Sequence, residues 1–228
     1  MLEIIFNHSH FVAINKPHDL LVHKTSIARD VQVFALQLLR DQLGYEVHPV
    51  HRLDRKTGGV LLFAKNRSDI SFFSNQFQFG KVQKSYLAIV RGHTEDFGII
   101  DYPLTNDSGK AQEAITHYET LDRSQMDFPS TQHPTSRYSL VQLEPKTGRM
   151  HQLRKHMAHI LHPIIADRPH GCNKQNKLLK EKFELMTMML HARTLQFEWR
   201  SERVVVEAEL QSEFKRMLGV LCLSLNGS

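Results

Sequence analysis

The sequence is poor in cysteine and contains no long apolar run. Its two cysteines, Cys172 and Cys222, lie far apart and fit neither a metal-binding spacing nor a redox motif, so we interpret them as reduced thiols. No stretch approaches the roughly 18–20 apolar residues of a membrane helix. The N-terminus also lacks the basic region and apolar run of a signal peptide. These absences predict a cytoplasmic protein without disulfides.

Charge of either sign is not in large excess. Lysine and arginine total 29 against 24 acidic residues, for a formal net charge of +5, and the 15 histidines add positive charge at mildly acidic pH. A basic surplus favours a polyanionic partner, yet many basic proteins never bind nucleic acid. Charge alone therefore leaves nucleic-acid binding open.

The sequence shows no repeat, no low-complexity tract and no linker rich in proline, glycine or serine. Its 228 residues are 41% hydrophobic and 23% charged, which is the balance of an ordinary globular protein. That length suits one large domain or two lobes. We therefore expect a single domain over residues 1–228, made of two closely packed lobes.

Periodicity predicts many strands and few helices. Because regular βαβ alternation is absent, we expect an α+β fold with a mixed, mainly antiparallel central sheet flanked by helices. The expected strands are 2–6, 11–15, 60–64, 86–90, 114–120, 139–143, 195–199 and 204–209.

Helices are expected in three places. The first covers 28–43 and stops at Gly44, the second runs from an N-cap at Ser68-Asp69 to Gly80, and the third covers 149–162. The polar segment 122–137 contains two prolines and is expected to be a surface loop.

The first cluster with chemical potential precedes an apolar strand and reads His51-Arg52-Leu53-Asp54-Arg55-Lys56-Thr57-Gly58-Gly59. Three cationic side chains surround one carboxylate, and nearby opposite charges keep Asp54 ionised as a nucleophile or base. The glycine pair allows a tight turn beside it. The alternative is a solvated ion pair at a strand entrance. The local chemistry permits a site without naming a reaction.

A second cluster spans residues 144–154 and joins a strand to a helix. The Thr147-Gly148 turn, followed by a helix rich in donors, suits phosphates or bases. Alternatively, Thr147 only caps the helix, and Arg149 and Arg154 are solvated.

A third segment, 84–92, alternates in strand fashion. Tyr86 and Ala88 then share one face of the strand. By default Tyr86 is a core aromatic whose hydroxyl has a partner.

Together and in this order, these three segments resemble the RluA-type pseudouridine synthases. Ala13-Ile14-Asn15-Lys16-Pro17 and Leu190-His191-Ala192 extend the resemblance over almost the whole chain. The two motifs around Asp54 and Arg154 are highly specific at this separation. The resemblance implies a pseudouridine synthase fold with a central active-site cleft, one catalytic domain over 1–228 and no N-terminal S4-type RNA-binding domain.

The resemblance also implies roles for individual residues. Asp54 matches the essential aspartate, and Tyr86 matches the tyrosine that stacks on the target base and is a candidate for removing the C5 proton. Arg154 matches the arginine that pairs with the catalytic carboxylate, and Arg52 the arginine that fills the gap left by the flipped nucleotide. Further RNA contacts are expected from His51, Arg55, Thr57, Lys84, Arg149, His151 and Gln152.

The implied reaction breaks the N1–C1′ bond of a uridine, rotates the uracil and rejoins it through C5. No redox change, group transfer or hydrolysis occurs, so we expect no cofactor. Asp101-Tyr102-Pro103-Leu104 and Thr116-His117-Tyr118 place the resemblance nearest to family members that modify the uridine at position sixty-five of tRNA. The alternatives are another uridine of tRNA or rRNA, or a non-catalytic RNA-binding protein.

A row of histidines offers a rival interpretation. His156, His159 and His162 follow His151 at intervals that suit one face of a helix and a metal ion. A metallohydrolase also needs an activating carboxylate, and only Asp167 is near. We therefore favour a polar helix facing RNA or solvent and expect no metal.

Two residues depart from the family pattern. Gly58 stands where serine is common, and Ala166 stands where glycine is common. We expect Gly58 to loosen the catalytic loop and Ala166 to be strained if its φ is positive.

Recognition of a particular RNA is expected from the polar segments 122–137 and 168–184. The second segment either tracks phosphates or is an ordinary solvated helix face. Its basic side chains are Lys174, Lys177, Lys180 and Lys182.

Overall fold

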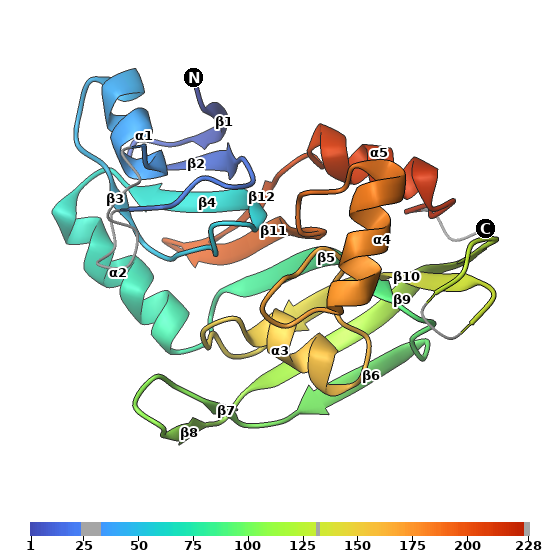
Figure 1. Ribbon diagram of the computed structural model, residues 1–228. Helices are drawn as coiled ribbons and strands as arrows, with labels where there is room; N and C mark the ends of the chain where they lie inside the picture. Colours follow the sequence, from blue (N-terminus) through green and yellow to red (C-terminus); the bar gives the residue numbers. More distant parts are fainter. Residues whose placement is uncertain (24–32, 131–132, 226–228) are drawn as a thin grey trace. The chain divides into compact units, whose positions relative to one another are not determined.

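The computed structural model describes residues 1–23, 33–130 and 133–225 (Figure 1). The chain forms two compact units. Unit 1 comprises Met1–Lys84 and Ala192–Gln211, and unit 2 comprises Ser85–His191 and Ser212–Ser228. The expectation of one domain stays a prediction.

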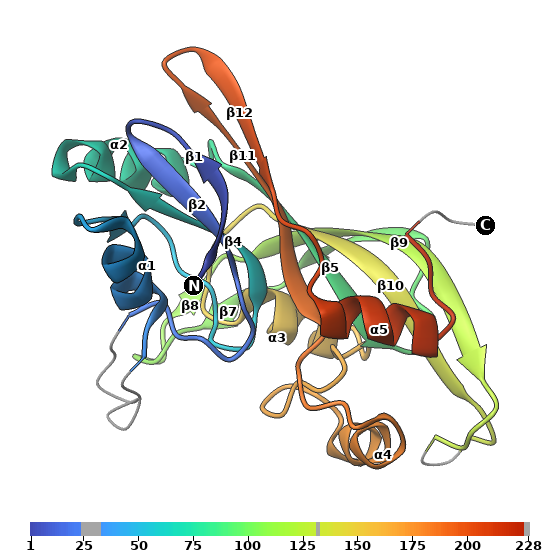
Figure 2. The ribbon, with the colours of Figure 1, turned by 90° about the horizontal axis from the view of Figure 1, so that it is seen from above.

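The sheet of unit 1 has the strand order β1-β2-β4-β11, with β3 paired to β4 and β12 to β11. The pairs β1–β2, β2–β4, β3–β4 and β11–β12 are antiparallel. Figure 2 shows β11 and β12 as a long hairpin. The strands are β1 (Glu3–Asn7), β2 (Phe11–Lys16), β3 (His48–Pro49), β4 (Gly58–Ala64), β11 (Leu190–Trp199) and β12 (Glu202–Glu207).

An aromatic core stabilises unit 1. Every residue of β2 and β4 is buried. Phe73 of helix α2 (Arg67–Gln78) stacks on Trp199 at 5.5 Å between ring centroids and meets Phe11 edge-on at 5.6 Å. Burial of each such side chain contributes about 1.5–3 kcal/mol. The run of apolar residues in β4 is therefore explained by burial on both faces.

The sheet of unit 2 has the order β5-β10-β9-β6, and β7 pairs with β8 in a separate two-stranded sheet. All of these pairs are antiparallel. The strands are β5 (Gln83–Arg91), β6 (Phe97–Asp101), β7 (Leu104–Thr105), β8 (Ala111–Gln112), β9 (Ile115–Met126) and β10 (Ser136–Pro145). The mainly antiparallel α+β fold expected from the sequence is confirmed.

Helix α3 (Gln152–His159) packs on β10 of unit 2 through Leu153 and Met157. The two remaining helices of this unit are α4 (Asn173–Phe183) and α5 (Ser212–Val220). No helix in the described ranges is long and apolar enough to cross a membrane.

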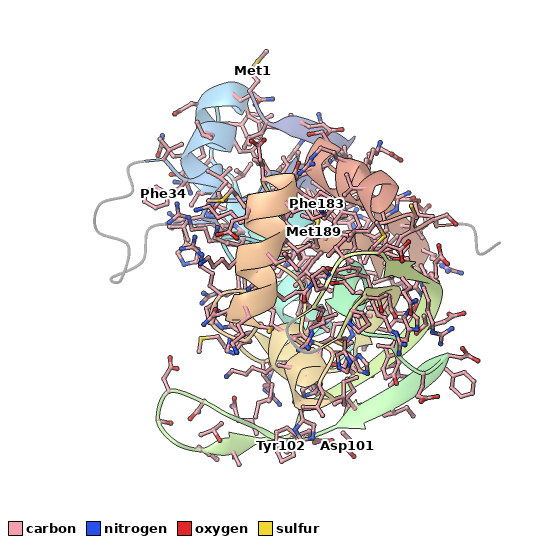
Figure 3. The ribbon with its side chains drawn as sticks, turned by 45° about the vertical axis from the view of Figure 1, so that its right-hand side comes forward. Met1, Phe34, Asp101, Tyr102, Phe183 and Met189 are labelled. Atoms are coloured by element: carbon pink, nitrogen blue, oxygen red, sulfur yellow. The ribbon has the colours of Figure 1, made fainter. Side chains whose placement is uncertain are left out.

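Helix α1 (Ala35–Leu43) begins later than expected. Residues 28–32 lie outside the described residues, but Val33 and Phe34 are not helical. Phe34, labelled in Figure 3 just before α1, is extended (φ −130°, ψ 149°) and forms a bridge with Leu21. That long-range bridge competes with the helix. The stop at Gly44 is confirmed, since Gly44 has φ 75° and donates its N–H to the Arg40 carbonyl.

The other two helices also differ from expectation at their ends. Helix α2 follows Asn66, so the expected N-cap at Ser68-Asp69 is two residues too late. The Asn66 side chain donates to Asp69 Oδ2 at 3.1 Å, which places Asp69 in the first turn. Helix α3 is shorter than 149–162 at both ends, because His151 and Leu161 take positive φ of 55° and 65°.

The expected surface loop over 122–137 is too long at both ends. Residues 122–126 belong to β9 and residues 136–137 to β10, and the two strands pair from Ser136↔Met126 onward. Both views show these strands side by side (Figures 1 and 2). Backbone pairing does not require apolar side chains on the face that meets water. A polar composition therefore misled the prediction.

Candidate active site

Asp54 lies at the head of a tight turn that leads into β4. The Thr57 N–H donates to the Asp54 carbonyl at 3.0 Å, which closes the turn. Leu53 before it is buried, whereas Asp54 is half-buried. Burial of Leu53 anchors the turn. Arg52 and Arg55, both predicted to contact RNA, are exposed.

The two glycines after the turn allow close packing. Gly59 has φ 106°, and a Cβ there would lie 2.1 Å from the Ala192 carbonyl oxygen. A Cβ on Gly58 would lie 2.8 Å from Gln211 Nε2 and 3.0 Å from His18 Nε2. Serine at position 58 would therefore displace these side chains. Loosening of the loop by Gly58 stays a prediction.

The fully buried Lys16 is hydrogen-bonded to the same turn. Lys16 Nζ donates to the carbonyls of Pro17 (2.9 Å), Leu20 (2.9 Å) and Arg55 (3.1 Å). Burial lowers the pKa of Lys16 to about 7, although the negative charges of Asp19 and Asp54 act in the opposite direction. Lys16 thus fixes the main chain directly after Asp54 and places a cationic group in its vicinity.

Two of the cations next to Asp54 in the sequence form ion pairs with Asp19. Arg55 Nε lies 3.7 Å and Lys56 Nζ 3.3 Å from Asp19 Oδ1, and Arg55 Nε also donates to the Asp19 carbonyl at 3.1 Å. These side chains are about half exposed, so each pair adds little stability. The sequence did not single out Asp19.

His51, expected to contact RNA, is engaged inside unit 1. Its Nε2 accepts the Leu62 N–H at 3.0 Å, and its ring stacks on Phe77 at 5.0 Å. The ring is therefore neutral and protonated at Nδ1. Burial, helped by the charge of Lys84, lowers the pKa of His51 to about 3.

Two further predicted RNA contacts of unit 1 are partly or fully removed from solvent. Burial lowers the pKa of Lys84 to about 8. Thr57 is only 2% exposed. Contact of either residue with RNA stays a prediction.

Tyr86 lies on β5 of unit 2, opposite Leu143 of β10. Its ring packs against the core cluster that contains Ala88 and Val141. Tyr86 and Ala88 thus share a face, as the alternation predicts. Tyr86 is half-buried.

Gln152 organises the loop before α3. Its Oε1 accepts from the Thr147 hydroxyl (2.7 Å) and the Arg149 N–H (3.0 Å). Its Nε2 donates to the Ile115 carbonyl (2.9 Å) and to Thr116 Oγ1 (3.1 Å). The amide thus makes four bonds within unit 2. Thr147 accepts the Ile115 N–H, so the alternative in which it only caps the helix is wrong.

Arg149 and His151 lie just before the first residue of α3. Arg149 is exposed, and its Nε donates to the Glu113 carbonyl at 2.9 Å. His151 takes φ 55°, an uncommon conformation for a residue other than glycine, and its Nδ1 lies 3.0 Å from His170 Nε2. Strained backbone of this kind clusters at functional sites.

Arg154 forms a buried, two-pronged ion pair with Asp167. Its Nε donates to Oδ2 at 2.7 Å and its Nη2 to Oδ1 at 2.8 Å. The two residues are 7% and 1% exposed. Such charge-assisted pairs fix the guanidinium plane. Pairing of Arg154 with Asp54 stays a prediction.

The histidines of α3 and of the segment after it each have separate partners. His156 is buried between Thr116 Oγ1 (2.9 Å) and the Tyr102 carbonyl (3.0 Å), and burial lowers its pKa. His159 stacks on Tyr102, which follows Asp101 at the end of β6 (Figure 3). His162 meets the Arg91 carbonyl. Within the described ranges, no three His, Cys, Asp or Glu side chains are grouped as metal ligands.

A cavity of about 450 Å³ opens on unit 2. Asp96, Glu119 and Glu144 contribute carboxylates to it, beside Phe97 and Tyr118. An acidic lining repels RNA phosphates. We do not assign this cavity to the site.

Lys16 and Asp167 were named in the sequence motifs, but neither was given a role in the site. For Lys16 the available signal was a lysine at the end of an otherwise apolar strand. For Asp167 it was an aspartate directly after the apolar run Pro163–Ala166. A charged side chain inside the protein needs a hydrogen-bond or ion-pair partner. A charged residue within or next to an apolar segment therefore indicates such a buried pair.

Comparison with known proteins identifies the family. A family model described as RNA pseudouridylate synthase matches residues 10–159. tRNA pseudouridine synthase C of Vibrio vulnificus is 41% identical, covering 95% of this chain and 94% of that protein. The protein of the same name from Haemophilus ducreyi is 42% identical over the same shares.

Solved structures agree with the sequence comparison. Human RNA Pseudouridylate Synthase Domain Containing 4 superposes with a TM-score of 0.76 at 27% identity, covering 98% of this chain and 94% of that one. The chain therefore belongs to the RNA pseudouridylate synthase family, and its activity is that of an RNA pseudouridine synthase.

Proposed function

We propose that this enzyme converts uridine 65 of tRNA to pseudouridine, with Asp54 as the catalytic group. The observation that carries the proposal is the half-buried Asp54 at the head of a turn whose main chain Lys16 anchors. Family membership supplies the reaction class.

Asp54 performs the first chemical step in this proposal. Its carboxylate either adds covalently to the sugar or base, or removes the C2′ proton. The bond to Asp54 is broken again, or the proton is returned to C2′, before the product leaves. The N1–C1′ bond breaks, the uracil rotates, and C5 bonds to C1′. The proton leaves C5 and N1 gains one, so the product is an isomer of the substrate and no atoms are exchanged overall.

The other site residues prepare the substrate. The target base must leave its stack, at a cost of a few kcal/mol. Arg52 occupies the vacated space and Tyr86 stacks on the base, which contributes about 1–3 kcal/mol. Arg154 pairs with Asp54.

The choice of tRNA rests on the relatives. Several bacterial proteins named tRNA pseudouridine synthase C are 40–42% identical over nearly the whole chain. The net charge of +5 is compatible with a polyanionic substrate. An enzyme acting on bacterial tRNA works in the cytoplasm.

The substrate is tested by mapping pseudouridine in RNA from cells with and without the gene. Loss of pseudouridine at uridine 65 alone supports the proposal. Loss at another tRNA or rRNA uridine would show the right reaction on a different substrate. If the purified protein converts no uridine in any tRNA or rRNA, the non-catalytic alternative stands.

A further inference from the structure

The side chain of Asn176 forms two hydrogen bonds to the turn that carries Asp167. We call this pair of bonds the clasp. Asn176 lies on α4, and its Nδ2 donates to the Asp167 carbonyl at 2.7 Å. Its Oδ1 accepts the Ala166 N–H at 2.9 Å. One side-chain amide therefore provides hydrogen-bond partners for both the Ala166 N–H and the Asp167 carbonyl of the turn.

The turn adopts a conformation that its own residues disfavour. Ala166 has φ 60°, which costs about 1–2 kcal/mol for a residue with a Cβ. Gly171 packs against the same turn, because a Cβ there would lie 1.9 Å from the Asp167 carbonyl oxygen. Contacts from the segment after it therefore hold the turn.

The direction of the Asp167 carboxylate follows from that backbone. The carboxylate receives both prongs of Arg154, and its Oδ1 also accepts the His170 N–H at 3.3 Å. Arg154 is 7% exposed, so water cannot replace a displaced Asp167. If the turn relaxes to negative φ, the guanidinium loses the partner that orients it.

We propose that Asn176 is a positioning residue for Arg154 and acts through the Asp167 turn. The inference rests on the proposed function, in which Arg154 pairs with the catalytic aspartate. Loss of the clasp then affects the chemical step and leaves RNA affinity unchanged. If α4 served only as a lysine-bearing RNA surface, the same change would raise KM.

The chain offers a matched control on the same helix. Asn173 is exposed at the start of α4, whereas Asn176 is half-buried against the turn. Asn176→Ala is expected to lower kcat on the order of 10–100-fold, since small misplacements of a catalytic group have effects of this size, with KM within about twofold. Asn173→Ala is expected to match the wild type in both.

A second substitution separates positioning from general stability. Ala166→Gly removes the cost of positive φ, so the turn holds its shape without the clasp. In the Asn176→Ala background this change is expected to recover part of the lost kcat, and in the wild type to leave kcat unchanged. Equal gains in thermal midpoint in both backgrounds, with no recovery of kcat, would overturn the inference.

The Nε–H resonance of Arg154 in an NMR spectrum reports the ion pair without reference to activity. It is expected to move toward the value of a free arginine in Asn176→Ala and to stay in place in Asn173→Ala. An unchanged resonance together with unchanged kcat overturns the inference. A shifted resonance in a protein whose wild type makes no pseudouridine overturns the proposed function and leaves the clasp of Asn176 on the turn intact.

Discussion

Lys16 donates a hydrogen bond from Nζ to the main-chain carbonyl of Arg55 at 3.1 Å, so a buried lysine holds the residue that follows Asp54. The same ammonium group binds the carbonyls of Pro17 and Leu20. One side chain thus joins the end of β2 to the turn that presents the carboxylate. The position of Asp54 depends on this link.

Lys16→Met keeps most of the side-chain volume and removes all three hydrogen bonds. Loss of each hydrogen bond costs about 1 kcal/mol. We expect the free energy of unfolding to fall by about 3 kcal/mol, and kcat to fall more than about tenfold because the turn shifts. Urea unfolding and single-turnover assays measure both. Lys81→Met, at an exposed site of unit 1, is the control, and equal behaviour of the two variants contradicts the role of Lys16.

Because His51 is neutral in the folded protein, the free energy of unfolding depends on pH in the acid range. Its pKa is about 3 in the folded protein and 6.5 in an unfolded chain. Between these values only the unfolded state binds the proton, so stability falls as pH drops from 6.5 toward 3, by at most about 1.4 kcal/mol per pH unit. Above pH 6.5 this contribution is constant.

The comparison for His51 is His51→Gln, which keeps an acceptor for the Leu62 N–H and does not titrate. Urea unfolding at pH 5, 6 and 7 should show a smaller loss of stability in the variant. Parallel slopes for the two proteins would assign the acid sensitivity to other groups.

Gly59→Ala tests the close approach of β4 to Ala192. A Cβ at 2.1 Å from a backbone oxygen cannot be accommodated by a side-chain rotation, so we expect a loss of about 3 kcal/mol or more. Gly80 also has a positive φ (67°, against 106° for Gly59) but open space around it, so Gly80→Ala should lose only about 1 kcal/mol. Similar losses at both sites would mean that strain in φ alone matters.

Gln152→Glu replaces a donor that faces the Ile115 carbonyl with an acceptor. We expect stability to fall by about 2 kcal/mol and the loop that carries Arg149 to move, which weakens RNA binding. Thermal unfolding and filter binding measure the two effects. If Gln152 acted as a direct RNA contact only, RNA affinity would fall while the thermal midpoint stayed unchanged.

Local patterns predicted the parts of the fold that depend on neighbouring residues. The apolar run of β4 and the helix stop at Gly44 are examples, because burial and left-handed φ are set by side-chain type. The face shared by Tyr86 and Ala88 followed from strand alternation.

Other features depend on residues that are distant in sequence. Phe34 leaves the helix to pair with Leu21, and the β9–β10 hairpin forms from polar residues through its backbone. The pair of Arg154 and Asp167 requires the chain to return after α3. Neither hydrophobic periodicity nor secondary-structure propensity indicates these contacts, so they could not be predicted without the structure.

The central claim is that the carboxylate of Asp54 carries the reaction. The most direct measurement is pseudouridine formation at uridine 65 of an unmodified tRNA by wild type, Asp54→Asn and the exposed control Asp41→Asn, with equal thermal midpoints verified first. Asp54→Asn is expected to form no pseudouridine, while Asp41→Asn matches the wild type. Pseudouridine formation by Asp54→Asn at the wild-type rate would contradict the account.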